Sequence, residues 1–167
     1  MNPCIEKLAK IAQKKERIIL GLMSGTSLDG LDIALCRVHL HGQQSELTLL
    51  KFLTMDYLPK FRDRVRAIFA KRNIDQQTLS GLNPYIAEVH ADLIDQALKH
   101  WEMEPEEIDL IASHGQTVYH APQSLTGDLT LPNSTLQLGD GDHLAVRTGI
   151  ITLSDFRQKH LAAGGEG

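Results

Sequence analysis

Two short apolar runs near the start of the chain enclose a turn that is rich in glycine, hydroxyl and carboxylate side chains. The first run covers 17–22, the second covers 31–38, and the turn lies between them. Apolar runs of strand length on either side of such a turn predict a β-hairpin. This part of the chain is therefore expected to begin an antiparallel sheet.

The composition of the turn indicates more than a reversal of the chain. A plain hairpin needs one glycine or asparagine at its tip, whereas this turn and its edges contain several glycines with Ser24, Thr26, Ser27, Asp29 and Asp32. Such a loop lets backbone N–H groups approach phosphate oxygens, with carboxylates nearby that hold Mg2+ through water. The plainer alternative is a surface hairpin whose polar side chains are simply solvated.

Two common phosphate-binding loops do not fit this turn. A Walker P-loop requires a Gly-Lys-Ser/Thr sequence and leads into a helix, whereas this loop lacks that sequence and leads into a strand. The glycine-rich loop of dinucleotide-binding proteins also opens a helix, so it is excluded for the same reason.

The remainder of the chain predicts a mixed α/β protein. A helix is expected over 2–16, and a third strand over 46–55 extends the hairpin into a meander. An amphipathic helix is expected to begin at Pro59, where proline fits the first turn. The other expected elements are helices at 76–82 and 85–101 separated at Pro84, a strand over 110–113 that delivers a polar loop, a loop over 121–133, a strand over 136–138, a helix through 144–147 that ends at Gly149, and a strand over 150–153.

Bulk composition narrows the class of protein. The net charge is −4 and no basic stripe occurs, which argues against nucleic acid as a partner. No apolar run approaches the roughly 20 residues that span a bilayer, and the first residues lack the apolar core of a signal peptide. Cys4, expected to be exposed, and Cys36, expected to be buried, are the only cysteines and form no metal or disulfide framework. These features predict a cytoplasmic protein without a membrane partner.

Four segments in order carry a resemblance to a known family. They are 21–32 (GLMSGTSLDGLD), 113–120 (SHGQTVYH), 136–140 (LQLGD), and 147–150 (RTGI) leading into 155–157 (DFR). Together they resemble the anhydro-N-acetylmuramic acid kinases, from residue 17 to the glycine-rich end at 162–167.

The resemblance implies the first lobe of an actin/hexokinase-like, ribonuclease H-like kinase, with an α/β fold and a mixed sheet made of an antiparallel meander and flanking helices. It divides the chain into an N-terminal extension (1–16), the first ATPase lobe (17–154) and the start of a crossover to a missing second lobe (155–167). Members of the family are roughly twice as long. We therefore expect an incomplete N-terminal fragment that alone neither turns over nor binds ATP tightly, and that exposes apolar surface facing the second lobe.

The reaction that the resemblance implies uses ATP and Mg2+. Water opens the anhydro bridge of 1,6-anhydro-N-acetylmuramic acid, the freed O6 receives the γ-phosphoryl group, and N-acetylmuramic acid 6-phosphate enters peptidoglycan recycling. The expected partners are this sugar and ATP, together with a second copy in a homodimer of the full-length protein.

The resemblance also assigns site residues. Those expected to bind ATP and its phosphates, with Asp29 holding Mg2+ through water, are Gly25, Thr26, Ser27, Leu28, Asp29, Gly30, Leu31 and Asp32. Those expected to bind the sugar are His114, Gln116, Thr117, Asp155 and Arg157. No catalytic residue is expected here, because the family's carboxylate segment corresponds to positions beyond Gly167.

Plainer roles stay open for several of these residues. Asp32 also suits a turn carboxylate, His114 a buried packing residue, and Asp155 with Arg157 a structural ion pair. Arg147 is expected to serve the local fold. A metal site at His114 and His120 is not expected, since no third ligand has suitable spacing.

Two positions depart from the commoner family pattern: His160 stands where an acidic residue is usual, and Glu166 stands where glutamine is usual. Two other functions compete with the kinase. One is a non-catalytic, single-lobe sugar- or nucleotide-binding module of the same superfamily. The other, less favoured by the 113–117 and 155–157 segments, is an acetate- or hexokinase-type enzyme with another substrate.

Overall fold

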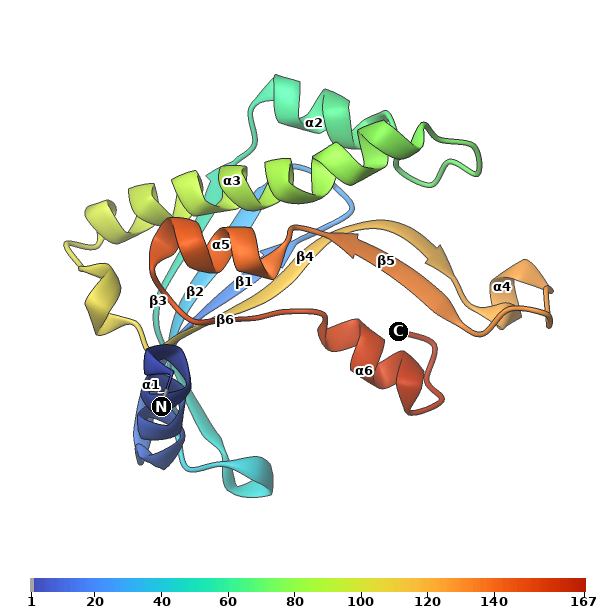
Figure 1. The fold of residues 1–167 in the computed structure, drawn as a ribbon. Coiled ribbons are helices and arrows are strands. Elements are labelled where there is room, and N and C mark those ends of the chain that lie inside the picture. Colours follow the sequence, from blue (N-terminus) through green and yellow to red (C-terminus); the bar gives the residue numbers. More distant parts are fainter. Residues whose placement is uncertain (1) are drawn as a thin grey trace.

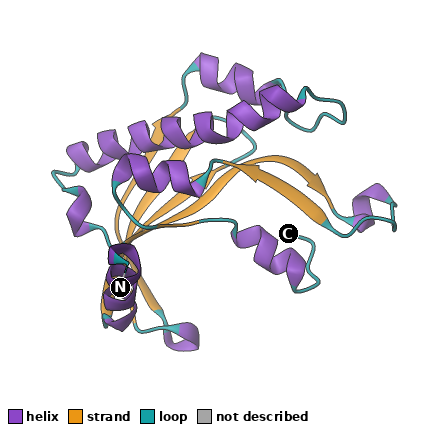
Figure 2. Cartoon of the chain, viewed as in Figure 1, coloured by secondary structure: helices purple, strands orange, loops and turns teal. Residues whose placement is uncertain are grey.

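The computed structural model describes residues 2–167 as a mixed six-stranded sheet with helices on its faces (Figures 1 and 2). The strands are β1 (Glu16–Ser24), β2 (Gly30–His39), β3 (Glu46–Asp56), β4 (Leu110–Ala121), β5 (Ser134–Leu138) and β6 (Thr152–Leu153). The order is β3-β2-β1-β4-β5, and β6 pairs with β4. The first three strands form an antiparallel meander, while β4 runs parallel to β1. The predicted α/β class, the mixed sheet and the meander are thus confirmed.

The helices lie on both sides of this sheet. They are α1 (Pro3–Gln13), α2 (Pro59–Arg66), α3 (Gln76–His100), α4 (Gln123–Thr126), α5 (Gly141–Thr148) and α6 (Phe156–Ala162), with short 3-10 turns η1 (Gly42–Gln44) and η2 (Pro105–Glu107). Figure 1 shows α3 crossing one face of the sheet with α2 and α5 beside it, whereas α4 lies at the far tip of the β4–β5 hairpin. Within residues 2–167, no helix combines the length and the hydropathy that a membrane crossing needs.

The core forms between α3 and the near face of the sheet. Alternate residues of β1 point to the same side, so Leu20 and Leu22 face α3 while Gly21 and Met23 face the other side. Ile86 and Ile94 of α3 are fully buried in the same apolar cluster. Burial of this long helix across the strands stabilises the part of the sheet from which the site projects.

Helix α3 is continuous, so the predicted break at Pro84 is wrong. The residue removes one backbone N–H and normally costs about 3 kcal/mol inside a helix. Here Leu82, Ile86 and Ala87 are buried on the two sides of Pro84, so the apolar face keeps its helical spacing across the proline. Packing against the sheet outweighs the local penalty.

Strand β4 is much longer than the predicted strand over 110–113. Its second half pairs antiparallel with β5, from Gln116 opposite Leu138 to Ala121 opposite Ser134. The expected polar loop after residue 113 is therefore a strand, and the prediction of a loop there is wrong. The cause is a pairing partner about twenty residues further along the chain, which periodicity within 110–113 does not reveal.

Helix α1 is docked against the meander. The Arg17 guanidinium donates to the backbone carbonyls of Ile11 (3.2 Å), Lys14 (2.7 Å) and Leu40 (2.7 Å). One side chain thus connects the C-terminal end of α1, through Ile11 and Lys14, to the residue that follows β2, Leu40. The division of the chain at residue 16 stays a prediction.

We expect substitution Ile94→Ala to lower the free energy of unfolding by about 2–5 kcal/mol, because it leaves a cavity under the C-terminal half of α3. Lys99→Ala on the exposed side of the same helix is the control, and its effect should stay within about 0.5 kcal/mol. Urea denaturation followed by circular dichroism measures both. Equal losses in the two variants would contradict the packing of α3 onto the sheet.

Candidate functional site

The predicted phosphate hairpin is the connection between β1 and β2 at residues 25–29. Leu28 adopts a left-handed backbone (φ 58°), which is unusual for a leucine, and its side chain is only 3% exposed. The Asp29 carbonyl accepts a hydrogen bond from Tyr57 N (3.0 Å). The tip is therefore anchored by a buried side chain and by the segment after β3, while Thr26, Ser27 and Asp29 stay exposed.

The two glycines of the hairpin have different requirements. A Cβ at Gly30 would meet the carbonyl oxygen of Met55 at 2.6 Å, so the antiparallel pairing excludes any side chain there. A Cβ at Gly25 would meet nothing closer than the Ser27 hydroxyl at 3.5 Å, and its φ lies outside the left-handed region. The fold thus requires glycine at 30 but not at 25, where a bare backbone lets a ligand come close.

The exposed carboxylate of Asp29 is suited to a hard cation. Its Oδ1 accepts from the Ser27 hydroxyl (2.7 Å) and from Gly30 N (3.0 Å). The Ser27 hydrogen bond, first among several, holds the pKa of Asp29 below its usual value, so the group is charged at neutral pH. No group of three or more His, Cys, Asp or Glu side chains gathers to hold a metal within residues 2–167. A cation at Asp29 would need water and phosphate oxygens as its other ligands.

The side chain of Asp32 lies at the start of β2, where Thr54 Oγ1 donates to its Oδ1 (2.6 Å). This bond to the neighbouring strand agrees with the plainer role of a structural carboxylate. Direct contact of Asp32 with ATP stays a prediction.

Gln116 ties β4 to the hairpin. It is fully buried, and its amide nitrogen donates to the carbonyls of Gly25 (3.2 Å) and Thr117 (3.0 Å), while its amide oxygen accepts from Ser24 Oγ (2.5 Å). The side chain therefore bonds within the protein and positions the turn. Contact of Gln116 with a sugar stays a prediction, as it does for Thr117, whose hydroxyl accepts from Gln137 Nε2 (3.2 Å).

The structure brings parts of three predicted segments to one hollow of about 400 Å³ on the sheet face opposite α3. His114, Asp32 and Phe156 line it together with apolar strand residues. His114 Nδ1 lies 2.8 Å from the Gly115 carbonyl, and its buried Nε2 has no partner among residues 2–167. The 155–157 segment therefore reaches the sheet face that also carries Asp32 and His114.

Asp155 and Arg157 flank Phe156 at the start of α6. Asp155 has a left-handed backbone (φ 61°), a conformation that aspartate tolerates better than most residues. Among the described residues, neither side chain forms an ion pair, with the other or with any other group. The structural Asp155–Arg157 pair is thus not formed, and a role in binding the sugar stays a prediction.

Two buried residues of the site have no part in the sequence prediction. Tyr57 follows β3, and its hydroxyl lies 2.7 Å from Ser24 Oγ and 2.8 Å from His90 Nε2. His90 stands on the buried face of α3 and is 1% exposed. A histidine at a core-facing position of an amphipathic helix is the signal that could have identified it.

Burial perturbs both of these groups. Desolvation raises the pKa of Tyr57 above its ordinary value, so its hydroxyl keeps its proton. Desolvation lowers the pKa of His90 from 6.5 to about 4, so the imidazole is neutral at physiological pH. His90 Nδ1 has no hydrogen-bond partner within the part of the chain that the structure describes. No acceptor among these residues is therefore present to stabilise a second proton on the imidazole.

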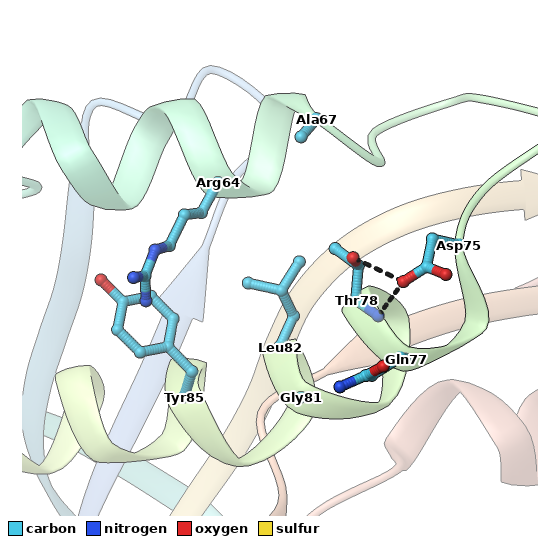
Figure 3. Close-up of a pocket in the computed structure, with 8 residues that line it drawn as sticks. All are labelled: Arg64, Ala67, Asp75, Gln77, Thr78, Gly81, Leu82 and Tyr85. Atoms are coloured by element: carbon cyan, nitrogen blue, oxygen red, sulfur yellow. Dashed lines mark hydrogen bonds between the residues drawn. The ribbon is translucent and has the colours of Figure 1, made fainter.

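A larger hollow lies elsewhere, between α2 and the first half of α3 (Figure 3). It measures about 530 Å³ and contains none of the predicted site residues. In Figure 3 the Arg64 guanidinium lies over the Tyr85 ring, at 4.5 Å from its centroid, while Asp75 accepts from Thr78 at the start of α3. Its charged groups are thus already used by the local fold.

The structure also settles two structural expectations. Arg147 Nε donates to Glu88 (2.7 Å) and its NH2 group to Asp92 (2.6 Å), so this residue fastens α5 to α3 as expected. Cys36 is buried and Cys4 is exposed, also as expected.

His160 contacts the glycine-rich end, where Gly167 N donates to its Nδ1 (3.2 Å).

Comparison with known proteins decides the family. The sequence model of the family described as Anhydro-N-acetylmuramic acid kinase matches residues 17–167. The chain belongs to the anhydro-N-acetylmuramic acid kinase family. The match confirms the resemblance that the four ordered segments indicate, and it begins at the first residue of the predicted lobe.

Curated relatives named anhydro-N-acetylmuramic acid kinase support the same conclusion. One from Pseudoalteromonas atlantica is 51% identical over the whole chain, and one from Pseudoalteromonas translucida is 49% identical. A relative from Caldanaerobacter subterraneus is 37% identical over 98% of the chain. The chain spans only about 42% of the length of the first two relatives and 41% of the third. A solved structure of CasPhi-2 bound to crRNA aligns with a TM-score of 0.25 at 11% identity, which is too low to bear on fold or function.

We expect Gly30→Ala to lower the free energy of unfolding by about 1–3 kcal/mol, because the new Cβ overlaps the Met55 carbonyl. Gly25→Ala should change it by no more than about 0.5 kcal/mol, since the site has room. Urea denaturation compares the two. An equally large loss in Gly25→Ala would mean that the fold, rather than a ligand, requires that glycine.

We expect His90 to make stability depend on pH. The pKa of His90 is about 4 in the folded protein, below its ordinary value of 6.5, so the unfolded state binds the proton more readily. The neutral imidazole contributes fully to the free energy of unfolding above pH 6.5. This contribution, about 3 kcal/mol, is lost as the pH falls from 6.5 toward 4.

The check uses His90→Gln, which cannot titrate in this range. The free energy of unfolding of wild type minus that of the variant should fall between pH 7 and pH 4.5. A difference that is the same at both pH values would contradict a neutral, buried His90.

Proposed function

We propose that this chain supplies the phosphate-binding lobe of an ATP-dependent kinase that acts on 1,6-anhydro-N-acetylmuramic acid. The observation that carries the proposal is the bonding of Gln116, from the 113–120 segment, to Ser24 and Gly25 of the glycine-rich hairpin. Two segments of the family signature, about ninety residues apart, thus form one connected structure at the carboxyl end of β1. Ligand loops at the carboxyl ends of parallel strands are typical of α/β sheets.

In this proposal the hairpin binds the phosphates of ATP. Backbone N–H groups of the exposed turn residues and the Thr26 hydroxyl donate to phosphate oxygens, while the Ser27 hydroxyl, which donates to Asp29, orients that carboxylate. The charged Asp29 side chain fits Mg2+ held through water, and Mg2+ when bound neutralises charge on the phosphates. Gly25, with its bare backbone, gives the phosphates access to the turn.

The sugar is proposed to bind near the start of α6, on the sheet face that carries the hollow lined by Asp32, His114 and Phe156. Arg157 has no ion-pair partner among the described residues, and a guanidinium suits the carboxylate of the lactyl group. Asp155 and His114, which belong to the segments on this face, supply further hydrogen-bonding groups.

The proposed reaction joins two bond changes. Water adds to the anomeric carbon and releases O6 from the anhydro bridge, and O6 takes the γ-phosphoryl group while ADP leaves. Catalysis of such a transfer depends on positioning and charge stabilisation. A carboxylate that removes the proton from water is assigned to no residue here. The cytoplasmic location, the homodimer and the absence of a nucleic acid partner stay predictions.

We expect Mg2+·ATP to shift the backbone amide signals of residues 25–30 in the NMR spectrum of the 167-residue chain, even where affinity is weak. Asp29→Asn should weaken this binding by about tenfold or more, because the group that holds Mg2+ loses its charge. Asp128→Asn is the matched control, since Asp128 is also exposed and also accepts from a hydroxyl two residues away.

Activity is measured on the chain extended to the length of its relatives, with ATP, Mg2+ and 1,6-anhydro-N-acetylmuramic acid. Turnover that Asp29→Asn reduces and Asp128→Asn leaves unchanged supports the kinase. Binding of Mg2+·ATP without turnover in the extended protein would favour the non-catalytic module. Hairpin signals that do not respond to Mg2+·ATP would contradict the proposal.

A further inference from the structure

Four buried side chains from separate elements form a single hydrogen-bonded chain beneath the hairpin. Gln116 of β4, Ser24 of β1, Tyr57 from the segment after β3, and His90 of α3 are each no more than 3% exposed. The successive distances are 2.5 Å, 2.7 Å and 2.8 Å. This chain connects the middle of the longest helix to the turn proposed to bind phosphates.

The donors and acceptors along this chain can be assigned from one end. The Gln116 amide nitrogen faces two carbonyls, so its amide oxygen must be the atom that accepts from Ser24. The Ser24 proton is thereby used, so Tyr57 must donate to Ser24. The Tyr57 oxygen then accepts from His90, which places the imidazole proton on Nε2.

Gln116, at the end of this hydrogen-bonded series of side chains, orients a peptide group of the hairpin. The Gly25 carbonyl accepts from Gln116 Nε2 (3.2 Å) and from Leu28 N (3.3 Å), so it points toward the buried side. In a planar trans peptide the C=O and N–H groups point in opposite directions. The N–H of Thr26 therefore points away from Gln116, and Thr26 is an exposed residue of the turn.

We propose that Tyr57 and His90 are positioning residues for phosphate binding. Through Ser24 and Gln116 they hold the Gly25–Thr26 peptide with its N–H directed at the ligand. The proposal rests on the proposed function, because it assumes that the ligand of this turn is the phosphate chain of ATP. Neither residue touches the ligand, and the neutral Nε2–H form of His90 is the form that completes the chain.

A purely structural role makes different predictions. If the four side chains only filled the core, loss of one hydroxyl would lower stability and leave the conformation of the exposed turn unchanged. If they position the turn, the same loss changes the environment of the hairpin amides and lowers the affinity for the ligand, even in a protein that stays folded.

The test uses NMR on the 167-residue chain with two pairs of variants. Tyr57→Phe removes the bonded hydroxyl and keeps the ring, which stacks on Phe61 with centroids 4.0 Å apart. Tyr85→Phe is the matched control, because Tyr85 belongs to the same aromatic group and its hydroxyl has no hydrogen bond within residues 2–167. His90→Leu removes the donor, whereas His90→Gln keeps an amide donor near the position of Nε2.

We expect Tyr57→Phe and His90→Leu to shift the amide signals of residues 25–29 and to lower the affinity for Mg2+·ATP by about five- to tenfold. Tyr85→Phe and His90→Gln should keep the wild-type signals and stay within about twofold in affinity. Long-range 1H–15N correlation in the wild type should show His90 protonated on Nε2.

The inference is overturned by a Tyr57→Phe variant whose hairpin signals match the wild type, or by a His90 that carries its proton on Nδ1. If His90→Leu does not fold, the hairpin signals of Tyr57→Phe and the protonated nitrogen of His90 still distinguish positioning from a purely structural role. If Mg2+·ATP shifts nothing in the wild type, the proposed function fails by itself. What is then judged is only whether Tyr57 and His90 position the turn: shifts of the hairpin amide signals in Tyr57→Phe but not in Tyr85→Phe support this, and any other result refutes it.

Discussion

The parallel pairing of β1 with β4 is the contact on which the rest of the site depends. It places Ser24 opposite Gln116, two residues that lie 92 positions apart in the chain. A parallel pair requires a long crossover connection. Here the connection contains β2, β3, α2 and α3, and α3 covers the near face of the sheet. The apolar packing of one helix and the geometry of the turn proposed to bind phosphates are therefore consequences of the same pairing.

Polar groups buried under the turn are costly unless each is hydrogen-bonded. The chain from His90 to Gln116 meets this requirement at nearly every atom, apart from Nδ1 of His90. The left-handed backbone of Leu28 is a second local cost, of order 1 kcal/mol, and burial of that leucine offsets it. Such costs are tolerated where the surrounding packing fixes a conformation, and both occur next to the predicted phosphate site.

Local signals predicted the elements whose causes are local. The glycine-rich turn predicted the hairpin, and the stretch 144–147 ended by Gly149 predicted α5, whose N-cap in the structure is Asp140. The predictions failed where a distant partner decides the structure. The second half of β4 depends on pairing with β5, and α3 continues through Pro84 because residues on both sides of it are buried by the sheet. The helical spacing alone could have placed His90 on a buried face, but the hydrogen bonds of Tyr57 and His90 form only once β1, β4 and α3 are together.

The family signature around the hairpin combines two requirements that the structure separates. Gly30 is needed by the pairing of β2 with β3, and Gly115 by the close approach of Leu138, whose carbonyl oxygen would lie 2.7 Å from a Cβ. Gly25 has space for a side chain, and Asp29 is exposed with its hydrogen bonds confined to the turn. A fold without a ligand would tolerate substitution at these last two positions. The packing of the protein therefore does not account for Gly25 and Asp29, whereas the proposed binding of phosphates to the turn gives both a role.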